Sequence, residues 1–160
     1  MKLEIELVPT TCWYSNVRSN VSPDTWRRLQ QAAFKAAGYV CEICGGTGDG
    51  HIVEAHEEWV YDDHRQIQRL GRLISLCPRC HEVKHIGLAI QSGHTNRALA
   101  WLVEVNQITP AEALAYVRRV FQIHEIRSRF EWKLDIELLP RQYGVKLDRH
   151  GIEIGFNVPG

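Results

Sequence analysis

Two Cys-x-x-Cys pairs constrain the fold of this chain more than any other feature of its sequence. The first pair is Cys41 and Cys44, and the second is Cys77 and Cys80. Four thiolates fill the tetrahedral coordination of one zinc ion, so such a site holds structure and leaves no position for chemistry. Zinc capture of this type contributes on the order of 10 kcal/mol to folding at neutral pH. The spacing therefore predicts a structural zinc that closes the intervening chain into a hairpin.

Three histidines near these pairs are candidates for a second metal site. His81 and His85 lie four residues apart in a segment of helical pattern, so they share one helix face. His56 ends a segment of strand pattern between the two cysteine pairs. Three imidazoles around one ion, with positions left for water and phosphate, describe a catalytic metal. Imidazole ligands favour zinc, nickel, cobalt or manganese over magnesium, which prefers oxygen donors.

The composition is that of an ordinary globular protein and makes no separate case for nucleic acid. Of 160 residues, 44% are hydrophobic and 24% charged, and Lys plus Arg equals Asp plus Glu at 19 each. The charges of residues 47–63 are all acidic, and those of residues 64–85 are mostly basic. This division suits a metal site beside a phosphate backbone, and it equally suits two solvated faces of one fold. Both interpretations stay open.

The fifth cysteine, Cys12, has no second thiol left to pair with and is expected to be a buried free thiol. Four cysteines in metal-type pairs fit a reducing compartment better than a disulfide framework. No apolar run approaches the roughly 18 residues of a membrane helix, and the N-terminus lacks a signal-peptide pattern. We therefore expect a cytoplasmic protein without a membrane partner.

The first 38 residues predict a strand and a helix. Apolar and charged residues alternate from Lys2 to Val8, which predicts a half-buried strand with Glu6 on its solvent side. Trp13 and Tyr14 lie in the link that follows, where we expect them to be packing anchors. A capping serine, a proline and an acid then begin a helix that Gly38 ends.

The middle of the chain predicts a compact ββα unit. A glycine-rich turn over residues 45–50 leads into a strand at residues 51–56, and a polar loop is expected over residues 57–66. A mixed apolar and basic segment at residues 67–76 reaches the second cysteine pair. A helix is expected over residues 81–91.

The last third predicts a helical hairpin followed by a β-hairpin. One helix is expected at residues 96–106, and a capping box formed by Thr109 and Glu112 begins a second, longer helix. The expected β-hairpin runs from Val145 to Ile154, with Gly151 in its turn.

Two stretches of the sequence resemble a known family. They are Val53-Glu54-Ala55-His56-Glu57 and the run from Leu76 to His85, which contains Cys-Pro-x-Cys-His-x-x-x-His. Together they resemble the HNH endonucleases of the ββα-metal type, in the subgroup that contains a four-cysteine zinc. The resemblance covers roughly residues 39–87, about a third of the chain. It implies an enzyme that hydrolyses phosphodiester bonds in DNA, with RNA left open as a substrate.

Carried over by position, the resemblance makes His56, His81 and His85 the ligands of a catalytic divalent metal, with Zn²⁺, Ni²⁺, Mn²⁺ and Mg²⁺ as the candidates. The sequence departs from the family at two catalytic positions. Glu57 stands where the family has its general base histidine, and Arg72 stands where it has an asparagine. We expect Glu57 to act as the base and Arg72 to clamp a phosphate oxygen. A second alignment makes His56 the base and leaves alanine at a ligand position.

These observations predict an α+β fold in three parts. Residues 1–38 form an N-terminal strand and a buttressing helix, residues 39–93 form a small zinc-stapled ββα-metal core of the HNH type, and residues 94–160 form a helical and β-hairpin annex. The alternatives to a nuclease are a nucleic-acid-binding or scaffold protein on an HNH frame that has lost its base, and a protein-binding module with two structural zincs. No sequence feature determines the oligomeric state.

Overall fold

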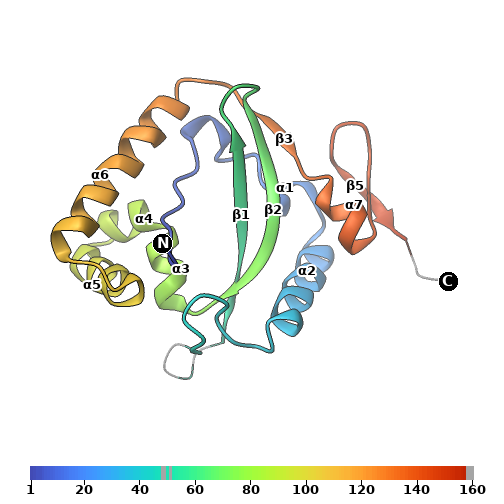
Figure 1. The fold of residues 1–160 in the computed structure, drawn as a ribbon. Coiled ribbons are helices and arrows are strands. Elements are labelled where there is room, and N and C mark those ends of the chain that lie inside the picture. The colour runs from blue at the N-terminus through green and yellow to red at the C-terminus, as the bar shows by residue number, and fades with distance from the viewer. Residues whose placement is uncertain (48–49, 51, 158–160) are drawn as a thin grey trace.

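The computed structural model describes residues 1–47, 50 and 52–157, which form a mixed α+β protein (Figure 1). The predicted turn at residues 45–50 and the predicted start of the first strand at residue 51 therefore fall partly outside the described residues. In chain order the elements are η1 (Thr10–Cys12, a 3₁₀ helix), α1 (Val17–Asn20), α2 (Pro23–Ala36), β1 (Glu54–Asp62), β2 (Ile67–Leu76), α3 (Pro78–Lys84), α4 (Ile86–Gln91), α5 (Thr95–Asn106), α6 (Pro110–Arg127), β3 (Lys133–Asp135), α7 (Leu138–Tyr143), β4 (Val145–Leu147) and β5 (Glu153–Phe156).

A long antiparallel hairpin of β1 and β2 occupies the middle of the molecule (Figure 1). The register begins with Glu54 opposite Leu76 and continues to Asp62. The polar loop predicted for residues 57–66 is therefore wrong over most of its length. Aromatic and β-branched residues in that stretch fit a pleated, half-buried strand, and this preference outweighs the acidic residues beside them. β3 pairs in parallel with β2, so β1 is an edge strand of this sheet.

The two faces of the hairpin bury two different hydrophobic clusters. Ile74 and Leu76 pack with α3, α5 and the N-terminal segment. Leu70 and Leu73 pack on the opposite face with α2 and α7. These two leucines share a face although they are an odd number of residues apart, because the register shifts at Gly71. A Cβ on Gly71 would lie 3.1 Å from the Val60 side chain, which explains the glycine at this bulge.

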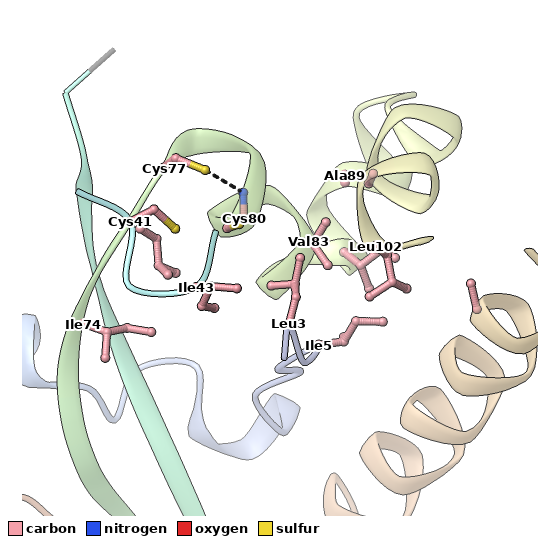
Figure 2. Packing of buried hydrophobic residues seen from close by; sticks show 14 residues of the cluster. Leu3, Ile5, Cys41, Ile43, Ile74, Cys77, Cys80, Val83, Ala89 and Leu102 are labelled. Atoms are coloured by element: carbon pink, nitrogen blue, oxygen red, sulfur yellow. Dashed lines mark hydrogen bonds between the residues drawn. The ribbon is translucent and has the colours of Figure 1, made fainter. Parts of the chain in front are cut away.

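The strand predicted for residues 2–8 is wrong. Leu3 and Ile5 are buried as the alternation predicted, and Figure 2 shows both among the helices beside the hairpin. Their backbone N–H groups bond to side chains instead of a neighbouring strand. The Leu3 N–H donates to Asn106 Oδ1 at 2.9 Å, and the Ile5 N–H donates to the Tyr116 hydroxyl at 3.0 Å. The segment is therefore an extended chain that α5 and α6 hold by their polar side chains.

The helix predicted to follow Ser22 is confirmed as α2. The Ser22 hydroxyl accepts the Thr25 N–H at 3.1 Å, and Gly38 follows the helix with a positive φ of 64°. The packing role predicted for Trp13 and Tyr14 is wrong, since their exposed fractions are 58% and 89%.

The helix predicted for residues 81–91 begins earlier and is interrupted. Pro78 takes the first helical position of α3, directly after Cys77. His85 then breaks the backbone between α3 and α4 with φ −99° and ψ 44°. The N-terminal segment lies against the end of α3 at this break, because the Glu6 N–H donates to the Lys84 carbonyl at 2.9 Å.

The last third contains the predicted helical pair and β-hairpin, but neither α7 nor the parallel pairing of β3 with β2 was predicted. α5 and α6 form the expected helical pair, and the capping box of Thr109 and Glu112 is present in both directions. β4 and β5 form the expected hairpin, whereas the short helix α7 before them was not predicted. Among the described residues no helix is both long and apolar enough to span a bilayer.

Replacing Asn106 with alanine tests how the N-terminal segment is held. Its side chain bonds to the N–H groups of Lys2 and Leu3 and to the Leu3 carbonyl. Leaving these partly buried groups unpaired is expected to lower the free energy of unfolding by about 2 kcal/mol in urea denaturation. Asn96→Ala, an exposed position on the same helix, is the control and should change it by less than about 0.5 kcal/mol. Equal stability of the two variants would contradict this account.

Candidate metal centres

The first cysteine pair lies in a tight turn that is attached to β2. The Cys41 N–H donates to the Gly46 carbonyl, and the Gly45 N–H donates to the Cys41 carbonyl, both at 2.9 Å. Gly45 has a positive φ of 78°, a backbone conformation in which glycine avoids the strain of a side chain. Glu42 fixes this turn to the hairpin, because its N–H donates to the Ser75 carbonyl and its carboxylate accepts the Ser75 N–H.

The second cysteine pair belongs to the start of α3. Cys77 is the N-cap, and its sulfur accepts the Cys80 N–H at 3.4 Å, as Figure 2 shows. Two further N–H groups point at sulfur atoms. The Trp101 indole donates to Cys80 Sγ at 3.3 Å, and the Gly46 N–H donates to Cys44 Sγ at 3.5 Å. N–H donors around sulfur favour the thiolate form, which is the form that binds metal.

The four sulfur atoms fit one metal ion. All lie within 4.8 Å of one another, and the Cys44 and Cys77 sulfurs are 3.6 Å apart. Zinc–sulfur bonds of about 2.3 Å place tetrahedral sulfurs about 3.8 Å apart, so little rearrangement is needed. Contact with the Cys80 thiol lowers the pKa of Cys41 to about 4, whereas burial raises the pKa of Cys77 to about 11. The four cysteines can therefore hold a metal ion and are compatible with zinc.

The three histidines also converge: His56 comes from β1, His81 from α3 and His85 from the junction of α3 and α4. Their ligand nitrogens lie within 4.8 Å of one another, and the centroids of their rings are 4.8 to 5.3 Å apart. His56 is only 4% exposed, and the other two are half-buried. Burial lowers the pKa of His81, and burial followed by the nearby histidines lowers the pKa of His85 to about 3. Both imidazoles are therefore neutral at pH 7, as metal ligands must be.

Two carboxylates orient two of these imidazoles, and sequence reasoning identified neither. Glu6 Oε2 lies 2.9 Å from His56 Nε2, and Glu54 Oε2 lies 2.5 Å from His81 Nδ1. An ionised carboxylate can only accept, so each imidazole donates the bonded N–H and turns its other nitrogen, with its lone pair, away from the carboxylate. Carboxylate–histidine–metal arrangements are built in this way. The Glu-x-His spacing of Glu54 and His56 could have indicated a role for Glu54 at this site. The alternation of residues 2–8 instead predicted that Glu6 faces solvent.

Glu57 lies beside His56 in sequence and on the other face of β1. It shares that face with Trp59, and its Oε1 accepts the Val17 N–H at 2.9 Å. Burial raises the pKa of the Glu57 carboxyl, although the N–H groups of Val17 and Arg18 lower it. Glu57 still lines, with the three histidines, a cavity of about 190 Å³ that borders the edge strand.

Arg72 is engaged away from the histidines. Its guanidinium donates to Glu58 at 2.5 Å and to Glu42 at 3.1 Å, and it lines a different cavity, between the hairpin and α6. The cation that lines the histidine cavity is Arg18, on α1. Arg18 makes no ion pair with any carboxylate that the structure describes. Nothing in its sequence neighbourhood indicates this position, because it depends on how α1 packs against β1.

Comparison with known proteins adds no family to this description. No family model, curated protein or solved structure matches the chain. The resemblance to HNH endonucleases therefore rests on the two motif stretches alone, and the chemistry of both centres must be argued from their geometry.

Replacing Cys41 with serine tests the four-sulfur centre. Without one thiolate the site loses a contribution on the order of 10 kcal/mol, which exceeds the stability of many domains. We expect loss of bound zinc by elemental analysis and collapse of the near-ultraviolet circular dichroism. Cys12→Ser, at a buried cysteine outside the centre, should keep one zinc per chain. A folded Cys41→Ser protein with wild-type zinc content contradicts the assignment.

Glu57 and its neighbour Glu58 predict opposite effects of pH on stability. The pKa of Glu57 is raised in the folded state, so its stabilising contribution is present at low pH and is lost as pH rises through that value. Burial also opposes ionisation of Glu58, but Arg72 and Lys84 outweigh it and lower the pKa, so its contribution is lost as pH falls. The ordinary pKa of both carboxyls is about 4.5, so the melting temperature of Glu57→Gln should gain on that of the wild type as pH rises above about 4.5. The melting temperature of Glu58→Gln should instead fall behind that of the wild type as pH rises toward about 4.5 from below, and should run parallel to it above that pH. Parallel pH profiles for both variants would contradict this.

Proposed function

We propose that the protein is a metal-dependent endonuclease of the HNH type that hydrolyses phosphodiester bonds in DNA, with His56, His81 and His85 holding the catalytic metal. The observation that carries the proposal is the convergence of three imidazoles, two of them oriented by carboxylates, on a cavity that is not closed by a fourth protein ligand among the described residues. Structural zinc sites fill all four positions, whereas catalytic sites keep one open.

The chain's own residues have distinct tasks in this proposal. Zinc at the four cysteines fixes the start of α3, and α3 carries His81 toward β1. The chemistry that a bound divalent ion supplies in such a reaction is stabilisation of charge on the phosphoryl group and on the departing 3′ oxygen. Arg18 lines the same cavity with a guanidinium that pairs with no carboxylate among the described residues, which suits a phosphate oxygen of the substrate.

Glu57 is the candidate general base. It borders the cavity, and burial raises the pKa of its carboxyl, which makes it a stronger base than an exposed glutamate. The N–H of Val17 donates to one carboxylate oxygen at 2.9 Å, which fixes the carboxylate at the border of the cavity. In this proposal Arg72 has no catalytic task, because Glu42 and Glu58 neutralise it.

The second candidate is a nucleic-acid-binding or scaffold protein on an impaired HNH frame. The observation that favours it is the same bond between Glu57 and the Val17 N–H, since a carboxylate that anchors α1 is less free to accept a proton from water. Glu57→Gln separates the two functions, because an amide oxygen still accepts the Val17 N–H while the basic group is lost. A catalytic base predicts a fall in cleavage rate of about 10²- to 10⁴-fold with DNA binding unchanged in a gel-shift assay. If the wild-type protein binds DNA but does not cleave it with any of the metals, the nucleic-acid-binding or scaffold function is favoured.

Cleavage of plasmid DNA tests the proposal directly. Wild-type protein with Mn²⁺, Ni²⁺ or Mg²⁺ should cleave at least about 100-fold faster than His56→Ala, because removing a ligand removes the metal. His64→Ala, an exposed histidine in the turn of the hairpin, should cleave like the wild type. Zinc content at the four cysteines reports whether each variant is folded. If His56→Ala cleaves the plasmid at the same rate as the wild type, the proposal is contradicted.

A further inference from the structure

We propose that Glu6, in the N-terminal segment outside the cysteine and histidine motifs, is a positioning residue that sets the tautomer of His56 so that Nδ1 is presented to the metal. This inference rests on the proposed metal site and names a part of it that the motifs do not contain. It places the segment before α1 inside the metal centre, although that segment lies far from His56 along the chain.

The contacts of Glu6 leave it little freedom. Oε2 lies 2.9 Å from His56 Nε2, and Oε1 accepts the Trp59 N–H at 2.6 Å. The Lys84 ammonium, only 5% exposed, lies 3.7 Å from Oε2. The backbone N–H of Glu6 itself donates to the Lys84 carbonyl. With a side chain that is 12% exposed, the carboxylate is fixed by three residues on two elements, β1 and α3.

The edge position of β1 explains why Glu6 reaches this place. The sheet order leaves β1 without a strand on its outer side, so the Trp59 N–H has no strand partner there. Glu6 accepts that N–H and thereby spans the distance from the edge of β1 to the helix that carries His81. The same carboxylate then meets His56, which points from β1 toward that helix.

The chemical consequence is a fixed imidazole. Because an ionised carboxylate accepts hydrogen bonds only, the His56 proton stays on Nε2 and the Nδ1 lone pair stays available. His81 has the reverse arrangement, since Glu54 binds its Nδ1 and leaves Nε2 for the metal. Carboxylates that orient metal-binding imidazoles typically contribute 10- to 100-fold to metal affinity.

Two measurements on protein loaded with zinc at the four cysteines test the role of Glu6. Heteronuclear NMR of the ¹⁵N-labelled protein, before any second metal is added, should find the His56 proton on Nε2. Titration with Co²⁺, followed by its visible absorption, should give a dissociation constant on the order of 10- to 100-fold weaker for Glu6→Ala than for the wild type. Glu6→Gln should also weaken Co²⁺ binding, because an amide has one accepting oxygen and cannot accept both the Trp59 N–H and the His56 N–H.

Glu4→Ala is the matched control, since Glu4 lies two residues away in the same segment and is exposed. It should bind Co²⁺ like the wild type. A His56 proton on Nδ1, or equal Co²⁺ affinity in Glu6→Ala and Glu4→Ala, overturns the role of Glu6 while the metal site stands. Wild-type protein that takes up no Co²⁺ at the histidines overturns the proposed metal site itself, and this inference with it. If Glu6→Ala does not fold, the NMR measurement on the wild-type protein, made before metal is added to the histidines, still tests the role of Glu6 separately from the metal site.

Discussion

The convergence of four sulfur atoms is the constraint on which the rest of the structure depends. It joins the turn after α2 to the first residues of α3, two segments that the whole length of the β1–β2 hairpin separates along the chain. Cys77 is at once a member of the four-sulfur cluster and the N-cap of α3, so the geometry of the cluster and the direction of that helix are tied together. The helix direction in turn decides whether His81 and His85 meet His56 on β1.

A chain of alternating charges links the two centres. Glu6 and Glu58 each contact a cation or an imidazole on either side, and several of the groups are largely buried, so each one fixes the next. Its last member, Glu42, also binds the backbone of β2 beside the cysteine turn. The chain runs through His56, Glu6, Lys84, Glu58, Arg72 and Glu42.

Sequence reasoning found both clusters of candidate ligands and missed the carboxylates that contact the histidines. Metal-binding residues often occur at short, characteristic spacings that can be recognised without knowing the fold. Both clusters could therefore be predicted from the sequence. Glu6 contacts His56, and Arg18 lines the cavity beside the histidines, through packing between segments distant along the chain that no local pattern can predict. The alternation in residues 2–8 identified the buried apolar side chains correctly but assigned Glu6 to solvent, because a periodic pattern cannot show that an extended chain is covered on both sides. Likewise, the acidic residues after His56 led to the prediction of a loop where β1 continues.

The most direct test of the central claim, that this chain holds one closed and one open metal centre, is anomalous diffraction. Crystals of the zinc-loaded protein soaked in Mn²⁺ should show a zinc peak among the four cysteine sulfurs. A second, manganese peak should lie among the three histidines, with His56 bound through Nδ1 and at least one position taken by water. A single peak at the sulfurs under every metal, or an ion at the histidines closed by a fourth protein ligand, contradicts the account.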